Sequence, residues 1–324
     1  MKHSRQYFFG FLRMAIAIGL LLYLSASGAI DWSAIFGLTA AWSTALKAFL
    51  LLFMTVLLQA QRFRLLLKPQ GMFLSFYSSV KLFLMGVFFN SCLPGANGGD
   101  AVKIYYAMEG NKGRGMEIAT LVLFDRAIGM FALLVLPLLF LPLFPELYGS
   151  IRPLRILLWT AAGVSAAMVT TLLLCFITPI TNNRFLLVVT QKLPMGGHAK
   201  RIFDAIYTYR HNAGTLLRVV GISFLVHIMN FGVVLLLARA INPGSAVWEM
   251  GVVVPLGFVA NSLPITPGGL GVGESAFNTL FAMVGLAGGA EILLGWRFLM
   301  ILIGAIGLTF YLQGQRRLVH ARHL

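Results

Sequence analysis

Two interruptions in otherwise apolar sequence decide how this chain folds. Residues 90–100 read NSCLPGANGGD, and residues 261–274 read NSLPITPGGLGVGE. In each stretch an Asn-Ser pair precedes a Leu-Pro pair, a Gly-Gly pair begins four residues after that proline, and an acidic residue follows. Proline and clustered glycines interrupt a helix and expose backbone polar groups. The two stretches therefore predict broken helices, which we call the first and the second break.

The composition indicates that these breaks lie in a membrane protein. Apolar residues make up 59% of the 324-residue chain and charged residues only 11%, whereas a soluble domain carries about 25% charged residues. A chain with so few charged residues has too little polar surface to cover the core of a soluble fold. The composition thus excludes soluble enzymes and nucleic-acid-binding domains, so we expect no nucleic-acid partner despite a net charge of +15. The sequence also carries no zinc, nucleotide or serine-hydrolase motif, so we expect no metal and no cofactor.

The apolar runs predict an all-α polytopic membrane protein with about six crossing helices. A helix needs roughly 20 apolar residues to cross the hydrocarbon core. Backbone such as that of the breaks survives at membrane depth only where it is buried in protein or lines a wet cavity. We therefore expect two re-entrant helical hairpins, at 73–110 and 250–288, in addition to the crossing helices. The crossings are expected near residues 8–29, 42–61, 117–144, 153–178, 217–240 and 291–314.

The basic residues support this layout and predict that both termini are cytoplasmic. Cytoplasmic loops of membrane proteins carry an excess of Lys and Arg. With two hairpins that return to the side they enter from, the outer loops hold only Arg152 and Arg155, with Arg239 at an edge. The cytoplasmic segments then hold sixteen basic residues: Lys2, Arg5, Arg62, Arg64, Lys68, Lys112, Arg114, Arg184, Lys192, Lys200, Arg201, Arg210, Arg218, Arg316, Arg317 and Arg322.

The two breaks also predict an internal repeat of inverted topology. Each lies between two crossings, and in this layout the first hairpin enters from the cytoplasm whereas the second enters from outside. Such repeats, with broken helices near the midplane, are typical of transporters; the alternative is that both loops are tight packing turns. We divide the single membrane domain, 1–324, into an anchor helix and outer loop (1–41), repeat A (42–144), a crossing helix with a cytoplasmic amphipathic segment (145–216), inverted repeat B (217–314) and a basic tail (315–324).

Polar side chains about the breaks form the candidate substrate site. Helix N-termini at the breaks suit a phosphate or carboxylate, and ionisable residues at membrane depth usually face a cavity or a partner. Adjacent residues cannot share one helix face, so Asp125 or Arg126 is expected to pair with another element. The candidate headgroup-binding residues are Asn90, Asn97, Asp100, Lys103, Lys81, Asp125, Arg126, Asn261, Glu274 and Arg297, and those expected to shape the loops are Pro94, Gly98, Gly99, Pro264, Pro267, Gly268 and Gly269. The alternative is that these charges form structural ion pairs.

Both break motifs, together with Asp125-Arg126, resemble the lysylphosphatidylglycerol synthase transmembrane family, the flippase-like membrane domain of MprF-type proteins. The resemblance covers nearly the whole chain. It implies a lipid translocator in a bacterial or archaeal inner membrane. Because the sequence ends ten residues after Gly314, we expect a stand-alone member without the soluble aminoacyl-transferase domain.

Three functions are compatible with the sequence. The first is a flippase-like transporter for a lipid with a phosphate-containing headgroup. The second is a membrane-embedded transferase that uses Asp100, Asp125 or Glu274 as a general base, which is disfavoured because no nucleophile or metal cluster accompanies these carboxylates. The third is a partner subunit of a lipid-modifying synthase or glycosyltransferase. Membrane lipids are the expected ligands, and a lipid-modifying partner enzyme and a homo-oligomer remain open.

Overall fold

The computed structural model describes residues 19, 21–26, 42–92, 98–109, 111, 113–177, 207–241 and 249–321. Within these residues the regular structure is helical. Short 3-10 turns lie at Lys68–Gln70, Leu141–Leu143, Tyr209–Asn212 and Pro267–Gly269. The α-helices of the longer described segments are α3 (Trp42–Leu67), α4 (Phe76–Cys92), α5 (Gly98–Glu109), α6 (Gly115–Phe140), α7 (Pro145–Ser150), α8 (Arg152–Ile177), α11 (Ala213–Ile241), α12 (Met250–Ser262), α13 (Val272–Met283) and α14 (Gly289–Ala321).

Five helical segments in the described part of the chain are long and apolar enough to cross a membrane. They are Trp42–Gln70, Gly115–Leu143, Arg152–Leu174, Ala213–Ile241 and Gly289–Gln313. These segments coincide with five of the crossings expected from the sequence, so the chain is a multi-pass helical membrane protein. Most of the expected first crossing, 8–29, lies outside the described residues.

Both predicted helix breaks are present. Helix α4 ends at Cys92 and α5 begins at Gly98; the intervening residues, which include Pro94 and Asn97, lie outside the described part. Helix α12 ends at Ser262, and α13 begins only at Val272. Three glycines of this second break adopt positive φ angles, of +59° at Gly268, +72° at Gly269 and +77° at Gly271. Glycine reaches these angles without the penalty of a Cβ.

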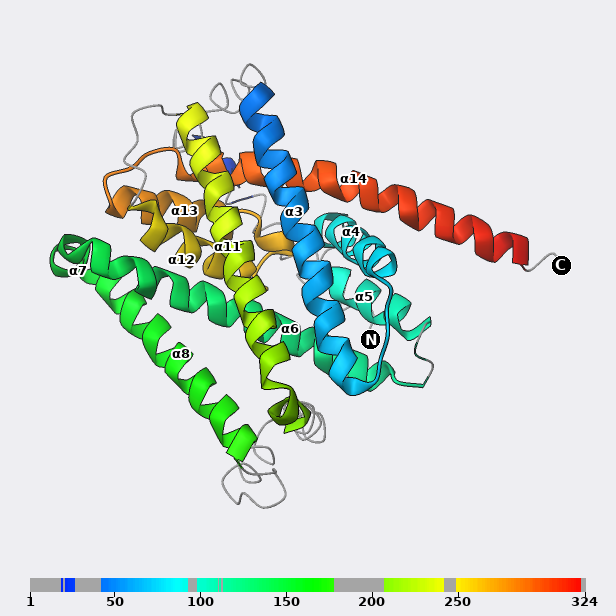
Figure 1. The fold of residues 1–324 in the computed structure, drawn as a ribbon. Coiled ribbons are helices and arrows are strands. Elements are labelled where there is room, and N and C mark those ends of the chain that lie inside the picture. The colour runs from blue at the N-terminus through cyan, green and yellow to red at the C-terminus, as the bar shows by residue number, and fades with distance from the viewer. Residues whose placement is uncertain are drawn as a thin grey trace, which may run out of the picture.

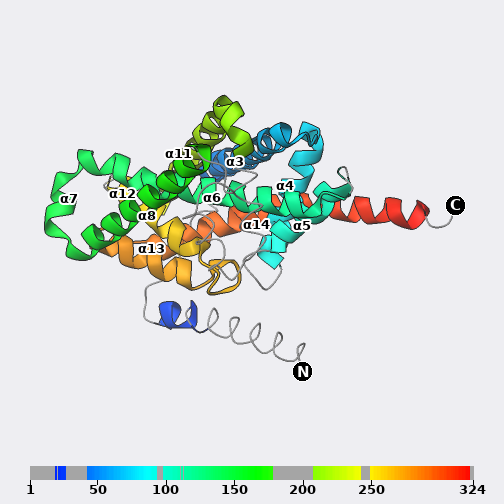
Figure 2. The ribbon, with the colours of Figure 1, turned by 90° about the horizontal axis from the view of Figure 1, so that it is seen from below.

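Helices near the first break pack against helices near the second break. Helix α3 packs along α11, α4 packs against α14, and α12 packs against α6. The α4–α5 and α12–α13 pairs lie on opposite sides of the molecule, and α6 and α14 run in opposite directions (Figures 1 and 2). Helix α8 extends from α6 through the short α7, and it forms an arm at one side of the bundle (Figure 1).

The loop before α11 is tied to the end of α3. Tyr209 is fully buried, and its hydroxyl donates a hydrogen bond to the carbonyl of Leu66. Burial raises the pKa of this Tyr209 hydroxyl. Tyr209 thus packs this loop against the end of α3. Residues 178–206, which contain most of the expected cytoplasmic amphipathic segment, lie outside the described part.

Close packing of α4 and α14 depends on small residues, and we expect Gly307→Ala to destabilise the protein. A Cβ at Gly307 would lie 2.0 Å from the Leu84 carbonyl oxygen, so the helices must separate. Overpacking of this kind typically costs about 1–3 kcal/mol, and it should appear as a lower thermal unfolding midpoint in detergent. Gly163→Ala on α8 is the matched control, because no atom lies within 4 Å of its Cβ position. Equal midpoints for the two variants would refute the close approach.

Candidate functional site

The first break is closed by a side-chain cap. The Oδ1 atom of Asn90, near the end of α4, accepts a hydrogen bond of 2.8 Å from the backbone N–H of Gly99. A Cβ at Gly99 would lie 2.2 Å from the Gly86 carbonyl oxygen, so only glycine allows α5 to approach α4 this closely. Asn90 and Gly99 thus turn the chain back on itself and place Asp100 in the first turn of α5.

Asp100 joins two cations at the start of α5. Its Oδ2 lies 2.9 Å from Nε of Arg126 on α6, and its Oδ1 lies 3.4 Å from Nζ of Lys103. Lys103 Nζ also lies 4.2 Å from the centroid of the Phe83 ring. The side chains of Asp100 and Lys103 are 13% and 14% exposed, whereas that of Arg126 is 44% exposed. The first break therefore presents an excess of positive charge, with Arg126 as its accessible edge.

The second break is held by an arginine. Arg297 of α14 donates from Nε to Glu274 Oε1 at 2.5 Å, from one terminal nitrogen to the Gly268 carbonyl at 2.6 Å, and from the other to Asn261 Oδ1 at 2.6 Å. Glu274 is fully buried, and its Oε2 accepts a 2.7 Å hydrogen bond from the Gly271 N–H at the start of α13. Arg297 thereby connects the two ends of this break and neutralises Glu274.

The two breaks lie against each other. A Cβ at Gly268 would be 3.7 Å from the Asn90 carbonyl oxygen and 3.9 Å from a terminal nitrogen of Arg297. Two loops that are far apart in the sequence therefore meet, and the ion pairs of both breaks are gathered in one region. These two distances are ordinary contact distances, so a side chain at Gly268 is disfavoured by the φ of +59° and not by a lack of space.

A buried ion pair lies beside the first break. Arg62 of α3 binds Asp125 of α6 through two bonds, of 2.7 and 2.8 Å, and its third nitrogen donates to Ser223 of α11 at 2.9 Å. Arg62 and Asp125 are each 5% exposed. Asp125 directly precedes Arg126, and Trp296 directly precedes Arg297. Trp296 forms a similar link, since its Nε1 donates to Asn230 Oδ1 at 3.0 Å. Asp125 thus links α6 to α3, and Trp296 links α14 to α11.

Comparison with known proteins agrees with these motifs. The family model described as the lysylphosphatidylglycerol synthase TM region matches residues 10–307. The chain belongs to this family. Neither a curated protein nor a solved structure matches it. Membership relates this membrane protein to lipid handling. It does not by itself describe the geometry of the two breaks and their ion pairs.

Most candidate residues of this family member lie in the region where the breaks meet. Asn90, Asp100 and Lys103 do so in the first break, with Arg126, and Asn261, Glu274 and Arg297 do so in the second. The expectation that Asp125 or Arg126 pairs with another element is confirmed for both residues. Asn97 lies outside the described residues.

Two basic residues have contacts that the sequence did not indicate. Lys81 contacts aromatic rings, with Nζ 4.2 Å from the Tyr77 centroid and 5.4 Å from that of Phe310, at the packing of α4 on α14. Arg62, counted above among cytoplasmic residues, is buried in the ion pair with Asp125. In the sequence, Arg62 directly follows the apolar run 42–61. Helix α3 continues past this run to Leu67, so Arg62 lies within the helix.

Proposed function

We propose that this protein is a flippase-like transporter. Its substrate is a lipid with a phosphate-containing headgroup, which in some lipids is aminoacylated or glycosylated. The protein moves this lipid between the leaflets of a bacterial or archaeal inner membrane. The observation that carries this proposal is the meeting of the two breaks, with Arg126, Lys103 and Arg297 gathered about them. Charges among apolar helices are costly in lipid, and they typically mark a substrate path.

The contacts of the helices support an inverted repeat. Helices α3, α4, α5 and α6 would correspond to α11, α12, α13 and α14. Under this correspondence the packing of α4 on α14 is the counterpart of α6 on α12, and α3 pairs with its own counterpart α11. The ion pairs correspond as well, because a carboxylate after each break binds an arginine of the next long helix. Two units related in this way can rock against each other and alternate access to a central site.

The chemistry at the first break suits a phosphate. Arginine binds phosphate oxygens with two parallel hydrogen bonds, and lysine adds a point charge. We propose that the headgroup phosphate binds Arg126 and Lys103, both of which contact Asp100 in its absence. Exchange between the Asp100 carboxylate and the lipid phosphate would keep both cations paired at all stages of the transport cycle. The lipid gradient, synthesis at one face or ion coupling would supply the driving force.

Leaflet exchange in reconstituted liposomes tests this function. We expect the purified protein to accelerate exchange of a fluorescent phosphatidylglycerol, measured by quenching from outside. Arg126→Gln should slow this exchange by about tenfold or more, because a hydrogen bond to a charged group contributes about 1.5–3 kcal/mol. Arg152→Gln, an exposed arginine at the start of α8, is the control and should exchange at the wild-type rate. Equal rates with and without protein, for phosphatidylglycerol, its aminoacylated form and a lipid-linked sugar, would exclude the proposal.

A further inference from the structure

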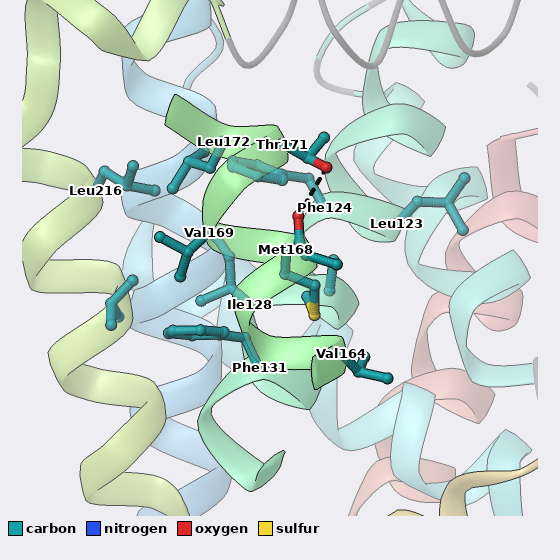
Figure 3. Close-up of a pocket in the computed structure, with 13 residues that line it drawn as sticks. Leu123, Phe124, Ile128, Phe131, Val164, Met168, Val169, Thr171, Leu172 and Leu216 are labelled. Atoms are coloured by element: carbon teal, nitrogen blue, oxygen red, sulfur yellow. Dashed lines mark hydrogen bonds between the residues drawn. The ribbon is translucent and has the colours of Figure 1, made fainter. Parts of the chain in front are cut away.

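Helices α6, α8 and α11 enclose an apolar pocket of about 470 Å³, on the side of α6 that faces α8. Figure 3 shows α11 as one wall and α8 as another, with Phe124, Ile128 and Phe131 of α6 pointing between them. The one polar side chain of the lining is that of Thr171. Its hydroxyl donates a 2.8 Å hydrogen bond to the Ala167 carbonyl within α8, so it is already used.

The surroundings of the pocket select a hydrocarbon chain as its occupant. All three helices have membrane-spanning length, and α8 is the least buried of the five spanning segments described, at 17%. Water is a poor occupant, because a buried water needs two to four polar partners. The volume falls within the range of roughly 300–1,000 Å³ that is typical of small-molecule sites. At this depth, the available apolar molecules are the acyl chains of lipids.

The rim of the pocket adjoins the cationic edge of the first break. Leu123 lines the pocket and Arg126 follows it by three residues on α6, and residues three apart are neighbours on a helix surface. Both side chains are accessible, with exposed fractions of 47% for Leu123 and 44% for Arg126. A lipid can therefore contact Arg126 with its phosphate while one of its chains passes over Leu123 into the pocket.

We propose that this pocket holds one acyl chain of the lipid whose phosphate binds Arg126. The inference rests on the proposed function, because that function places the headgroup at Arg126. Lipid tails are as apolar as leucine, so moving a chain from the bilayer into the pocket provides little driving force. The phosphate contact selects the lipid, and the pocket fixes the direction of one chain. The transported lipid is thus held at two points, and only its second chain stays in the surrounding bilayer.

Photo-crosslinking in liposomes tests this site. The full-length protein is reconstituted with phosphatidylglycerol that carries a diazirine in one acyl chain, irradiated and digested, and the labelled peptides are mapped by mass spectrometry. We expect label in residues 123–131 and 164–172. Ala167→Phe fills the pocket and should reduce this label about tenfold, and Arg126→Gln should reduce it as strongly because the chain is no longer anchored. Ile156→Phe, on an exposed position of α8 outside the lining, should leave it unchanged.

Three results would overturn the proposal. The first is no label in these two peptides, as expected if another segment of the chain or a second copy fills the pocket. The second is equal label in Arg126→Gln and wild type. The third is equal label from a diacylglycerol analogue, which has the same acyl chains but no phosphate, because the chain would then enter the pocket without the contact to Arg126. These results differ from a failure of the proposed function: label without leaflet exchange refutes transport alone, and exchange without label refutes the pocket alone.

Discussion

Asp125→Asn is expected to lower the free energy of unfolding by about 3–5 kcal/mol, because removal of one partner leaves the other charge buried and unpaired. Arg62 would keep its hydrogen bond to Ser223 but lose both bonds to a carboxylate. Arg62 and Asp125 are each only 5% exposed, so solvent cannot replace the lost partner. This pair joins α3 and α6, and through Ser223 it also reaches α11. Its loss should therefore loosen the contact between the two proposed repeats.

Chemical unfolding in mixed micelles measures this effect. The double variant Arg62→Met/Asp125→Leu should recover most of the lost stability, since an apolar replacement of a whole buried pair is often neutral. The control is Glu117→Gln, which removes the exposed pair between Arg114 and Glu117 and should change stability by less than about 1 kcal/mol. If Asp125→Asn is as stable as Glu117→Gln, the conclusion that Arg62 and Asp125 form a buried ion pair is wrong.

Arg297→Met is expected to open the second break and abolish leaflet exchange. The substitution removes the donors to Glu274, to the Gly268 carbonyl and to Asn261. Glu274 is fully buried, and it would keep the hydrogen bond from the Gly271 N–H. An uncompensated buried charge again costs about 3–5 kcal/mol. We therefore expect both the stability and the transport rate to fall.

Hydrogen exchange separates a local opening from global unfolding in this variant. Amides of residues 261–274 should exchange faster in Arg297→Met, while those of α3 should keep their protection under native conditions. Arg126→Met is the matched control at the first break. There Asp100 keeps Lys103 and is 13% exposed, whereas Glu274 is fully buried, so the transport rate should fall while stability falls by less than in Arg297→Met. Unchanged protection of residues 261–274 would contradict the role of Arg297 as a clamp.

The contrast between these arginines could not be read from the sequence. Arg126 and Arg297 occupy similar places after their breaks, and both were predicted to bind the headgroup. The structure makes Arg297 the donor to three residues at 14% exposure and leaves Arg126 at 44% exposure. The difference arises from the loops. The second break places the Gly268 carbonyl and the side chains of Asn261 and Glu274 around Arg297, and this placement depends on the backbone angles of the loop.

The sequence by itself determined the membrane class, five of the crossing segments and the positions of the two breaks. These features depend on local properties, since the length of an apolar run decides whether it can span and proline with glycine decides where a helix stops. It also indicated that Asp125 or Arg126 has a partner, because a charge among apolar residues needs one.

Only the tertiary structure decided which residues pair. The sequence predicts Arg62 in a cytoplasmic segment, whereas it is buried against Asp125, and the contacts of Lys81 with Tyr77 and Phe310 have no signal in the sequence. Likewise, the pocket between α6, α8 and α11 leaves no mark in the sequence, where its lining is indistinguishable from other apolar helix faces. The physical reason is that pairing and cavity shape depend on how helices far apart in the chain approach each other, and that approach is set by packing rather than by local composition.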